Sequence, residues 1–157
     1  MPNKVDDFIP FRLLQFIEAR LKSIDTAMGY NSDPFVTDDW HLAESSTAKQ
    51  VLFFETPGIE MDDQGVGDGK TVQPAMTIDV IGVCTYETER PRRLAMALEQ
   101  DVRVAIHSAL GDIRDSVGRG CSMTYGSCVY DGGVLAPIKE AGFRLSLIFT
   151  WSQRSGW

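Results

Sequence analysis

The chain has 157 residues, of which 43% are hydrophobic and 24% are charged, and a chain of this size buries roughly two-thirds of its unfolded surface. Its 22 acidic residues outnumber its 15 basic ones, and the net charge of −7 argues against tight binding to free nucleic acid, which needs a concentrated basic surface. No run approaches the roughly 20 apolar residues that span a membrane, and the acidic start is unlike a secretion signal. We therefore expect a single domain over 1–157 with no membrane contact.

The segment 8–26 predicts an amphipathic helix. Asp6 or Asp7 can cap its start, and Pro10 is tolerated in a first turn because the N–H groups there have no helical partner. Gly29 is expected to stop the helix, since glycine adopts the left-handed conformation at little cost. The apolar stripe recurs at helical spacing and consists of Leu13, Leu14, Phe16, Ile17, Leu21 and Ile24.

The next part of the chain alternates between polar stretches and short apolar runs. Residues 30–49 predict a loop with a strand fragment near 35–37, and residues 51–55 predict a strand that the following Pro-Gly pair ends. The stretch 57–74, PGIEMDDQGVGDGKTVQP, has little to pack against a core, so it predicts a long loop between two strands. Loops of that length are usually functional or disordered.

The second half predicts a strand, a helix and two further strands. Residues 76–86 alternate as a strand with one fully buried face. A helix follows, capped by Thr88 and ended by Gly111, on which Glu99 and Arg103 form a favourable i,i+4 pair. Its apolar face consists of Leu94, Leu98, Val102, Ala105 and Ala109. Residues 121–130 and 143–151 predict strands, and the latter, FRLSLIFTW, has the clearest period of two in the chain.

This order of elements predicts an α+β domain. We expect a mainly antiparallel or mixed sheet of about four strands, with two helices packed on one face and a long inter-strand loop. No internal repeat or linker divides the chain.

The motifs that carry catalytic or binding chemistry are incomplete. The run ending in Gly69-Lys70-Thr71 is similar to a phosphate-binding loop, but Gln64 stands where the motif needs its first glycine. Asp62, Asp63 and Asp68 lack the spacing of a calcium loop. We therefore predict no metal and no cofactor.

No arrangement of histidines, serines and cysteines predicts an enzyme. His107 has no metal ligand at suitable spacing on its helix, and His41 with Ser45 has neither a strained turn nor oxyanion donors. The three cysteines, Cys84, Cys121 and Cys128, form no CxxC pair and predict free thiols in a reducing compartment. The sequence predicts a protein without catalytic activity.

Three segments resemble the tail-terminator or tail-completion proteins of tailed bacteriophages. They are the opening helix FRLLQFIEARLKSIDTA, the strand–turn–helix PAMTIDVIGVCTYETERPRRLAMALEQDVRVAIHSAL with its LxxDVxxAI pattern, and the closing strand FRLSLIFTW. The likeness spans most of the chain and lies in the order and texture of its elements. The insertion at 30–49 departs from it.

The resemblance implies a homohexameric ring that caps the tail tube, stops tube polymerisation and meets the head-side connector or a neck protein. Its partners would be further copies of itself, the major tail tube protein and the connector, with DNA passing through the channel without tight binding. It implies a virion protein of the tail, assembled in the host cytoplasm, with no cofactor.

Two sets of residues are candidate assembly contacts. The loop set, expected to contact other copies or the tube, is Asp62, Asp63, Gly65, Gly67, Asp68 and Lys70. The candidate interface arginines are Arg90, Arg92 and Arg93, for which a solvated helix face is the simpler interpretation. Three alternatives stay open: a neck or head-closure adaptor ring, a small soluble ligand-binding domain, and a monomeric binding module.

Overall fold

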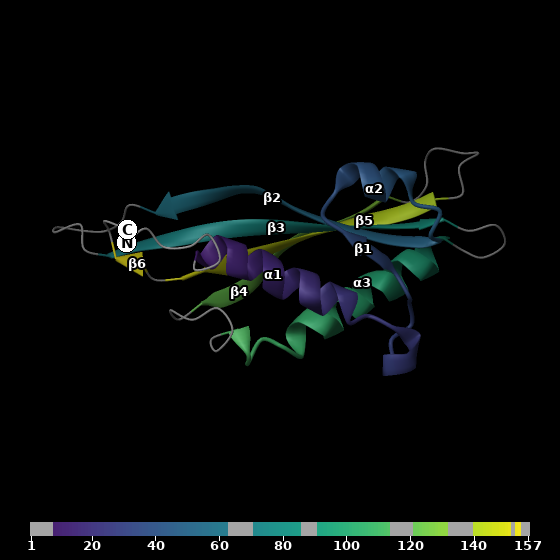
Figure 1. Cartoon of the computed structure of the whole chain (residues 1–157), viewed down its shortest axis with the longest axis horizontal. Helices are drawn as coiled ribbons and strands as arrows, with labels where there is room; N and C mark the ends of the chain where they lie inside the picture. The colour runs from purple at the N-terminus through teal and green to yellow at the C-terminus, as the bar shows by residue number, and fades with distance from the viewer. Residues whose placement is uncertain are drawn as a thin grey trace.

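The structure is a computed structural model that describes residues 8–62, 71–85, 91–113, 121–131, 140–151 and 153–154. In chain order these residues form α1 (Ile9–Lys22), the 3₁₀ turn η2 (Thr26–Met28), β1 (Phe35–Thr37), α2 (Trp40–Ser45), β2 (Gln50–Asp62), β3 (Thr71–Thr85), α3 (Pro91–His107), β4 (Ser122–Asp131), β5 (Glu140–Thr150) and β6 (Gln153–Arg154) (Figure 1).

Strands β1 to β5 form one sheet in the order β1-β2-β3-β5-β4. The β1–β2 pair is parallel, whereas β2–β3, β3–β5 and β4–β5 are antiparallel, so the sheet is mixed. β6 pairs with the first residues of β3. The predicted α+β class with a mainly antiparallel or mixed sheet is confirmed. The predicted strand fragment near 35–37 is confirmed as β1. The predicted number of about four strands was too low, because it counted neither this fragment nor β6, which is too short to show a period.

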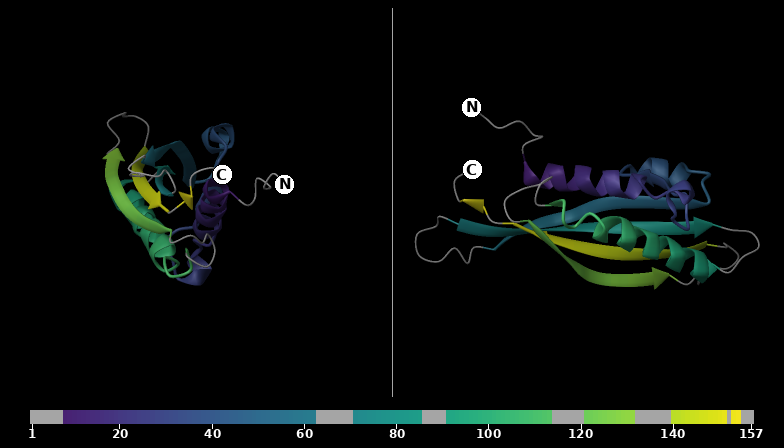
Figure 2. Two further views of the ribbon diagram at one scale, coloured as in Figure 1. Left: turned by 90° about the vertical axis from the view of Figure 1, so that its left-hand side faces the viewer. Right: turned by 90° about the horizontal axis from the view of Figure 1, so that it is seen from below.

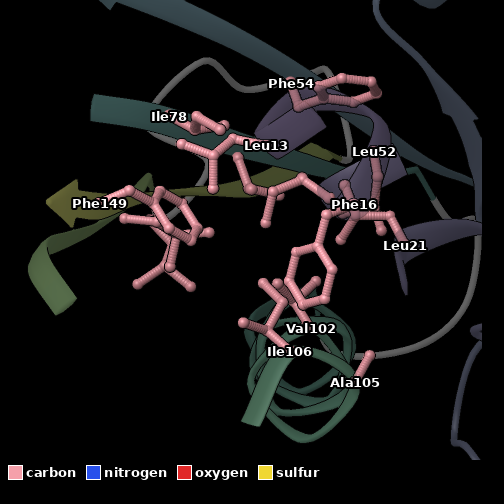
Figure 3. Packing of buried hydrophobic residues seen from close by; sticks show 14 of the residues in the cluster. Leu13, Phe16, Leu21, Leu52, Phe54, Ile78, Val102, Ala105, Ile106 and Phe149 are labelled. Carbon is pink, nitrogen blue, oxygen red and sulfur yellow. The ribbon is translucent and has the colours of Figure 1, made fainter. Parts of the chain in front are cut away.

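The core lies on one face of the sheet, beneath α1 and α3. The alternate residues of β3 and β5 that were expected to be buried are buried, since both strands run through the middle of the sheet. Figure 3 shows the two helices meeting over them, with side chains that include Leu13, Phe16, Leu21, Leu52, Phe54, Ile78, Val102, Ala105, Ile106 and Phe149.

A third helix, α2, covers part of the opposite face. Its Trp40 ring packs edge-on against Phe53 of β2, with ring centroids 5.4 Å apart. Leu52 and Phe54, the neighbours of Phe53 in the strand, belong to the core beneath α1 and α3. Because successive side chains in a strand point to opposite faces, α2 lies across the sheet from α1 and α3 (Figure 1). The prediction of two helices on one face was right for these two and missed the third.

The predicted loop over 57–74 was wrong at both of its ends, while its middle, residues 63–70, lies outside the described residues. β2 continues to Asp62 and β3 begins at Thr71, and the two strands pair from Gly58↔Thr77 to Asp62↔Gln73. The Pro-Gly pair does not end β2, because the register shifts between Glu55 and Gly58 and absorbs it as an irregularity in the ladder. Pairing with a distant strand therefore overrides the local turn signal.

The helix ends also differ from their predicted positions. α1 ends at Lys22, where Ser23 N–H donates to the Arg20 carbonyl, and Gly29 with φ of 91° closes the later η2 turn. α3 ends at His107, before Gly111. From Ala109 the backbone forms hydrogen bonds to the carbonyl three residues earlier, such as Ala109 N–H to the Ile106 carbonyl, and these replace the four-residue spacing of the α-helix. The predicted caps Asp6, Asp7 and Thr88 lie outside the described residues.

Candidate assembly surfaces

The β2–β3 pair extends beyond the rest of the sheet as an arm. β5 follows β3 only as far as the Ala75↔Thr150 pair, while β2 continues along β3 to Gln73. The side chains of residues 55–60 are all exposed. Figure 2 shows this arm at one end of the long axis, past the end of the helices. The β2 strand of the arm therefore presents its side chains to the surroundings at that end, whereas Pro74 and Met76 of β3 are buried.

The outer edge of β2 is open along the arm. β1 pairs with β2 only from Val51 to Phe53, and no other strand in the described part of the chain pairs with that side of β2. The exposed side chains there include Ile59, which is 44% exposed. An open edge carries unpaired N–H and C=O groups that can pair with a strand of another molecule. This edge is the clearest structural candidate for assembly.

The predicted site residues fall at two places that the structure keeps apart. Asp62 is the last residue of β2, whereas Asp63, Gly65, Gly67, Asp68 and Lys70 lie outside the described residues, as does Arg90. Arg92 and Arg93 are exposed in the first turn of α3. The end of β2 and the start of α3 lie at opposite ends of the long axis (Figure 1). One contact surface cannot include both.

A polar cluster lies on the sheet face that α1 and α3 leave uncovered. Asp79 of β3 is only 6% exposed and accepts a hydrogen bond of 2.7 Å from the Ser146 hydroxyl of β5. The Arg144 guanidinium lies 3.5 Å from Asp79 and 4.0 Å from Glu55 of β2. The cluster thus ties three adjacent strands together, in which Asp79 is paired with both Glu55 and Ser146, and its contacts stabilise the sheet.

A second cluster joins α3 to β4. Glu99 is buried and accepts hydrogen bonds from Arg103 and from the Tyr130 hydroxyl, the latter at 2.9 Å. The Arg103 guanidinium also lies over the Tyr125 ring, 4.8 Å from its centroid. Burial, then the hydrogen bond to Glu99, raises the pKa of Tyr130. The predicted Glu99–Arg103 helix pair is confirmed. Its buried Glu99 also accepts the hydrogen bond from Tyr130, and so joins α3 to the edge strand β4.

No catalytic geometry connects the titratable residues that the structure describes. His41 on α2 and His107 at the end of α3 are both exposed, and no group of three His, Cys, Asp or Glu side chains in the described ranges could hold a metal ion. An open groove between α1 and α3 is lined by residues that include Arg20, Tyr30, Asp101 and Ser108. Arg20 and Asp101 are engaged in helix and loop contacts there, so the groove offers no reacting group.

Sequence reasoning missed one exposed feature, the short helix α2. The segment was assigned to a loop because its apolar residues show no sustained helical period. Asp39 carried the available signal, since its carboxylate accepts the His41 and Leu42 N–H groups as a helix N-cap. Trp40 and Leu42 follow directly and are 55% and 53% exposed. The cap predicts a helix start, and only the tertiary contact with Phe53 fixes where the helix lies.

No protein-family model matches the chain, and no curated protein matches it. Among solved structures it is similar to the sheath/tube terminator of an extracellular contractile injection system, PVC, in the extended state. The two share 12% sequence identity and superimpose with a TM-score of 0.40. The match covers 99% of this chain, which spans 59% of the length of the other. The likeness concerns the course of the backbone alone.

No helix in the described ranges is long and apolar enough to cross a membrane.

Proposed function

We propose that this chain is a structural subunit of a homohexameric ring that caps the tail tube of a tailed bacteriophage. The ring stops polymerisation of the tube protein and joins the tail to the head-side connector. The subunit acts without catalysis and without a cofactor, in the tail of a particle assembled in the host cytoplasm. Two observations support the proposal: the order of elements, which resembles that of tail terminators, and the open arm formed by β2 and β3.

The arm is the observation that carries the proposal. A ring built from identical copies needs two different surfaces on each subunit that fit one another. The open edge of β2 supplies strand-pairing groups, and the exposed residues 55–60 flank it. The six-residue stretch is long enough for a strand of a neighbour, because strands in proteins are typically about five or six residues long. An edge left open on a monomer would instead invite irregular aggregation.

The charge of the chain fits a subunit that lines a DNA channel. The formal net charge is −7, so a ring of such subunits would repel the phosphate backbone and let DNA pass. Tight binding would oppose passage. The predicted absence of a nucleic-acid site is therefore part of the proposed function.

The proposal is tested first by the mass of the purified chain. Native mass spectrometry and negative-stain electron microscopy should show a closed hexamer with a central opening. The tube protein of the same particle is then polymerised with and without the ring, and the ring should bind tube ends and stop elongation. A stable monomer over the accessible concentration range would overturn the proposal. A ring that binds the connector and leaves tube elongation unchanged would favour the neck or head-closure adaptor.

A further inference from the structure

The segment between Lys22 and Lys49 contains no lysine or arginine. Its acidic residues are Asp25, Asp33, Asp38, Asp39 and Glu44, and the last three surround or lie on α2. Asp39 is engaged as the helix N-cap, whereas Asp38 and Glu44 are exposed and have no hydrogen bond or ion pair within the described structure. The surface around α2 is therefore acidic and has no lysine or arginine from its own segment.

The same surface exposes large apolar side chains. None of the six residues of α2 is buried, and Trp40 and Leu42 are each more than half exposed. Phe35 of β1 is 40% exposed and lies on the same sheet face as Phe53, two residues along the paired strands. A helix of six residues is too short to be stable in water without tertiary packing. Covering this α2 surface, made of Phe35, Asp38, Trp40, Leu42 and Glu44, would stabilise it.

The outer side of α3 has the complementary character. Arg92, Met96, Gln100 and Val104 follow one another at a spacing of four residues, so they share one side of the helix, with Arg93 beside the first of them. All five are exposed or partly so, and Met96 is 56% exposed. Neither arginine makes an ion pair within the described ranges. This α3 surface is basic at its start, and farther along it exposes the apolar side chains of Met96 and Val104.

The acidic residues of α3 do not oppose that charge, because both are turned inward. Glu99 is 6% exposed and is held by Arg103 and Tyr130. Asp101 is 2% exposed and accepts hydrogen bonds from the Asn31 backbone and side-chain amides, the latter at 2.9 Å. The exposed side of α3 is thus left with positive charge only, in a chain whose overall charge is negative.

The two surfaces cannot meet within one copy, but they are placed to meet between copies. α2 lies on one face of the sheet and α3 on the other, and both lie toward the end of the molecule away from the arm (Figures 1 and 2). A closed ring requires that the two joined surfaces lie at the same height along its axis. We propose that the α2 surface of one copy docks on the α3 surface of the next copy, with Asp38 and Glu44 facing Arg92 and Arg93.

A second copy is the occupant that the charges favour. The α2 and α3 surfaces belong to the same chain, are opposite in charge and each expose apolar side chains. One contact repeated between identical copies would therefore cover both surfaces. The inference rests on the proposed ring and specifies which surfaces close it. The contact does not use the open β2 edge, which lies at the other end of the molecule and stays available for strand pairing with a neighbouring subunit or with the tube.

Charge reversal tests the contact directly. The variants are Asp38→Lys with Glu44→Lys, Arg92→Glu with Arg93→Glu, and the chain carrying all four changes. Light scattering after size exclusion and native mass spectrometry report the oligomer, and circular dichroism reports the fold. Each double variant should shift the chain to monomer, since like charges then face each other across the contact. The fourfold variant should reassemble, because the opposite charges face each other again.

Mixing the two double variants tests whether the α2 surface of one copy docks on the α3 surface of the next. Each double variant alone presents two surfaces of like charge. In a mixture, the α2 lysines of the first variant face the α3 glutamates of the second, and the native α3 arginines of the first face the native α2 acids of the second. An even-numbered ring should therefore form from an equimolar mixture. Glu18→Lys with Asp112→Lys is the matched control for the lysine variant, since it makes the same change in net charge outside both surfaces. Asp112 is exposed, and Glu18 is partly exposed and paired with Lys22 of its own helix, an i,i+4 surface pair that contributes little to stability. This control should leave the oligomer intact.

The outcomes separate this contact from the proposed function. A wild-type monomer would overturn the ring and with it the contact. A wild-type ring that both double variants leave unchanged would overturn the contact alone. Loss of assembly in the double variants without restoration in the fourfold variant or the mixture would also overturn it, since a structural defect would then account for the loss. If a double variant fails to fold, Asp38→Asn with Glu44→Gln replaces it and should weaken assembly at least several-fold.

Discussion

Gly82 and Phe143 face one another across the β3–β5 pair, and their fit shows how closely the middle of the sheet is packed. A Cβ atom added at Gly82 would overlap the Phe143 ring, and one added at Gly142 would lie 2.8 Å from the Gly82 carbonyl. Both residues are paired strand positions with ordinary strand backbone. Glycine is needed at Gly82 because the aromatic ring occupies the space of a side chain.

We expect Gly82→Ala to lower the free energy of unfolding by about 1–3 kcal/mol, because Phe143 must leave its position in a packed core. Urea denaturation followed by fluorescence measures the change. Gly58→Ala is the control, since nothing lies within 4 Å of an added Cβ there. Equal effects at the two positions would contradict the packing of Phe143 over Gly82.

Leu147 lies fully buried in β5, as the alternation of that strand predicted. Leu147→Asp should destabilise the chain by several kcal/mol, because an unpaired carboxylate would enter the core. Val129 lies on the edge strand β4 and is 60% exposed, so Val129→Asp should change stability by less than about 1 kcal/mol. Chemical denaturation of the two variants measures both changes in the free energy of unfolding. If Leu147→Asp were tolerated, the side chain of Leu147 would not face the core, and the observed register of β5 would be contradicted.

At the scale of elements, the two core helices are pinned to each other by few polar contacts. The Arg20 guanidinium of α1 donates to the Ala105 carbonyl at 2.9 Å and to the Ser108 hydroxyl at 3.1 Å. Asp101 of α3 holds the chain that leads from η2 to β1 through Asn31. These contacts set how the helices and the acidic segment are placed on the sheet. The helical period predicted each helix and could not predict these contacts.

The arm gives the prediction that belongs to the element scale. Deleting residues 65–70 should leave the domain folded, because the described core lies away from the arm, and should weaken ring formation or docking to the tube. Thermal denaturation should stay cooperative with a midpoint near that of the full chain, while binding to tube ends should fall. Loss of cooperative unfolding would mean that the segment serves the fold. Unchanged tube binding would count against the arm as the contact.

At the scale of the whole molecule, buried thiols and a buried phenol make stability depend on alkaline pH. Burial raises the pKa of Cys84 and of Cys121 to about 11, and burial with a hydrogen bond to Glu99 raises that of Tyr130. A raised pKa in the folded state means that the unfolded chain loses its proton first as pH rises. The stabilisation is therefore fully present below about pH 9 and is lost as pH rises toward 11.

We expect the free energy of unfolding to fall between pH 9 and pH 11, measured by urea denaturation at several pH values. Cys84→Ala should give a shallower fall, because one of the contributing protons is then absent from both states. A profile of the same slope in the variant and the parent chain would contradict the assignment to Cys84. Thiol labelling of the native protein offers an independent check, since Cys84 and Cys121 are buried and should react slowly.

The sequence alone predicted the elements whose pattern reflects their own burial. The helical stripes of α1 and α3 and the alternation of β3 and β5 are such patterns, because each period records one buried face. It also predicted the α+β class and the pairing of Glu99 with Arg103, which are local in the chain. The contacts of Asp79 could not be predicted in this way, because its partners Ser146 and Arg144 come from a distant strand.

Only the tertiary structure decided where the remaining surfaces lie. The stretch 57–74 by itself predicts a long loop, but pairing between β2 and β3 makes residues 58–62 and 71–74 part of the arm, because a strand's hydrogen bonds come from a partner far along the chain. The same holds for α2, whose place depends on Phe53, and for the separation of Arg92 and Arg93 from the arm. Local periods determine which face of an element is buried, and long-range contacts determine which surfaces are left exposed for a neighbour.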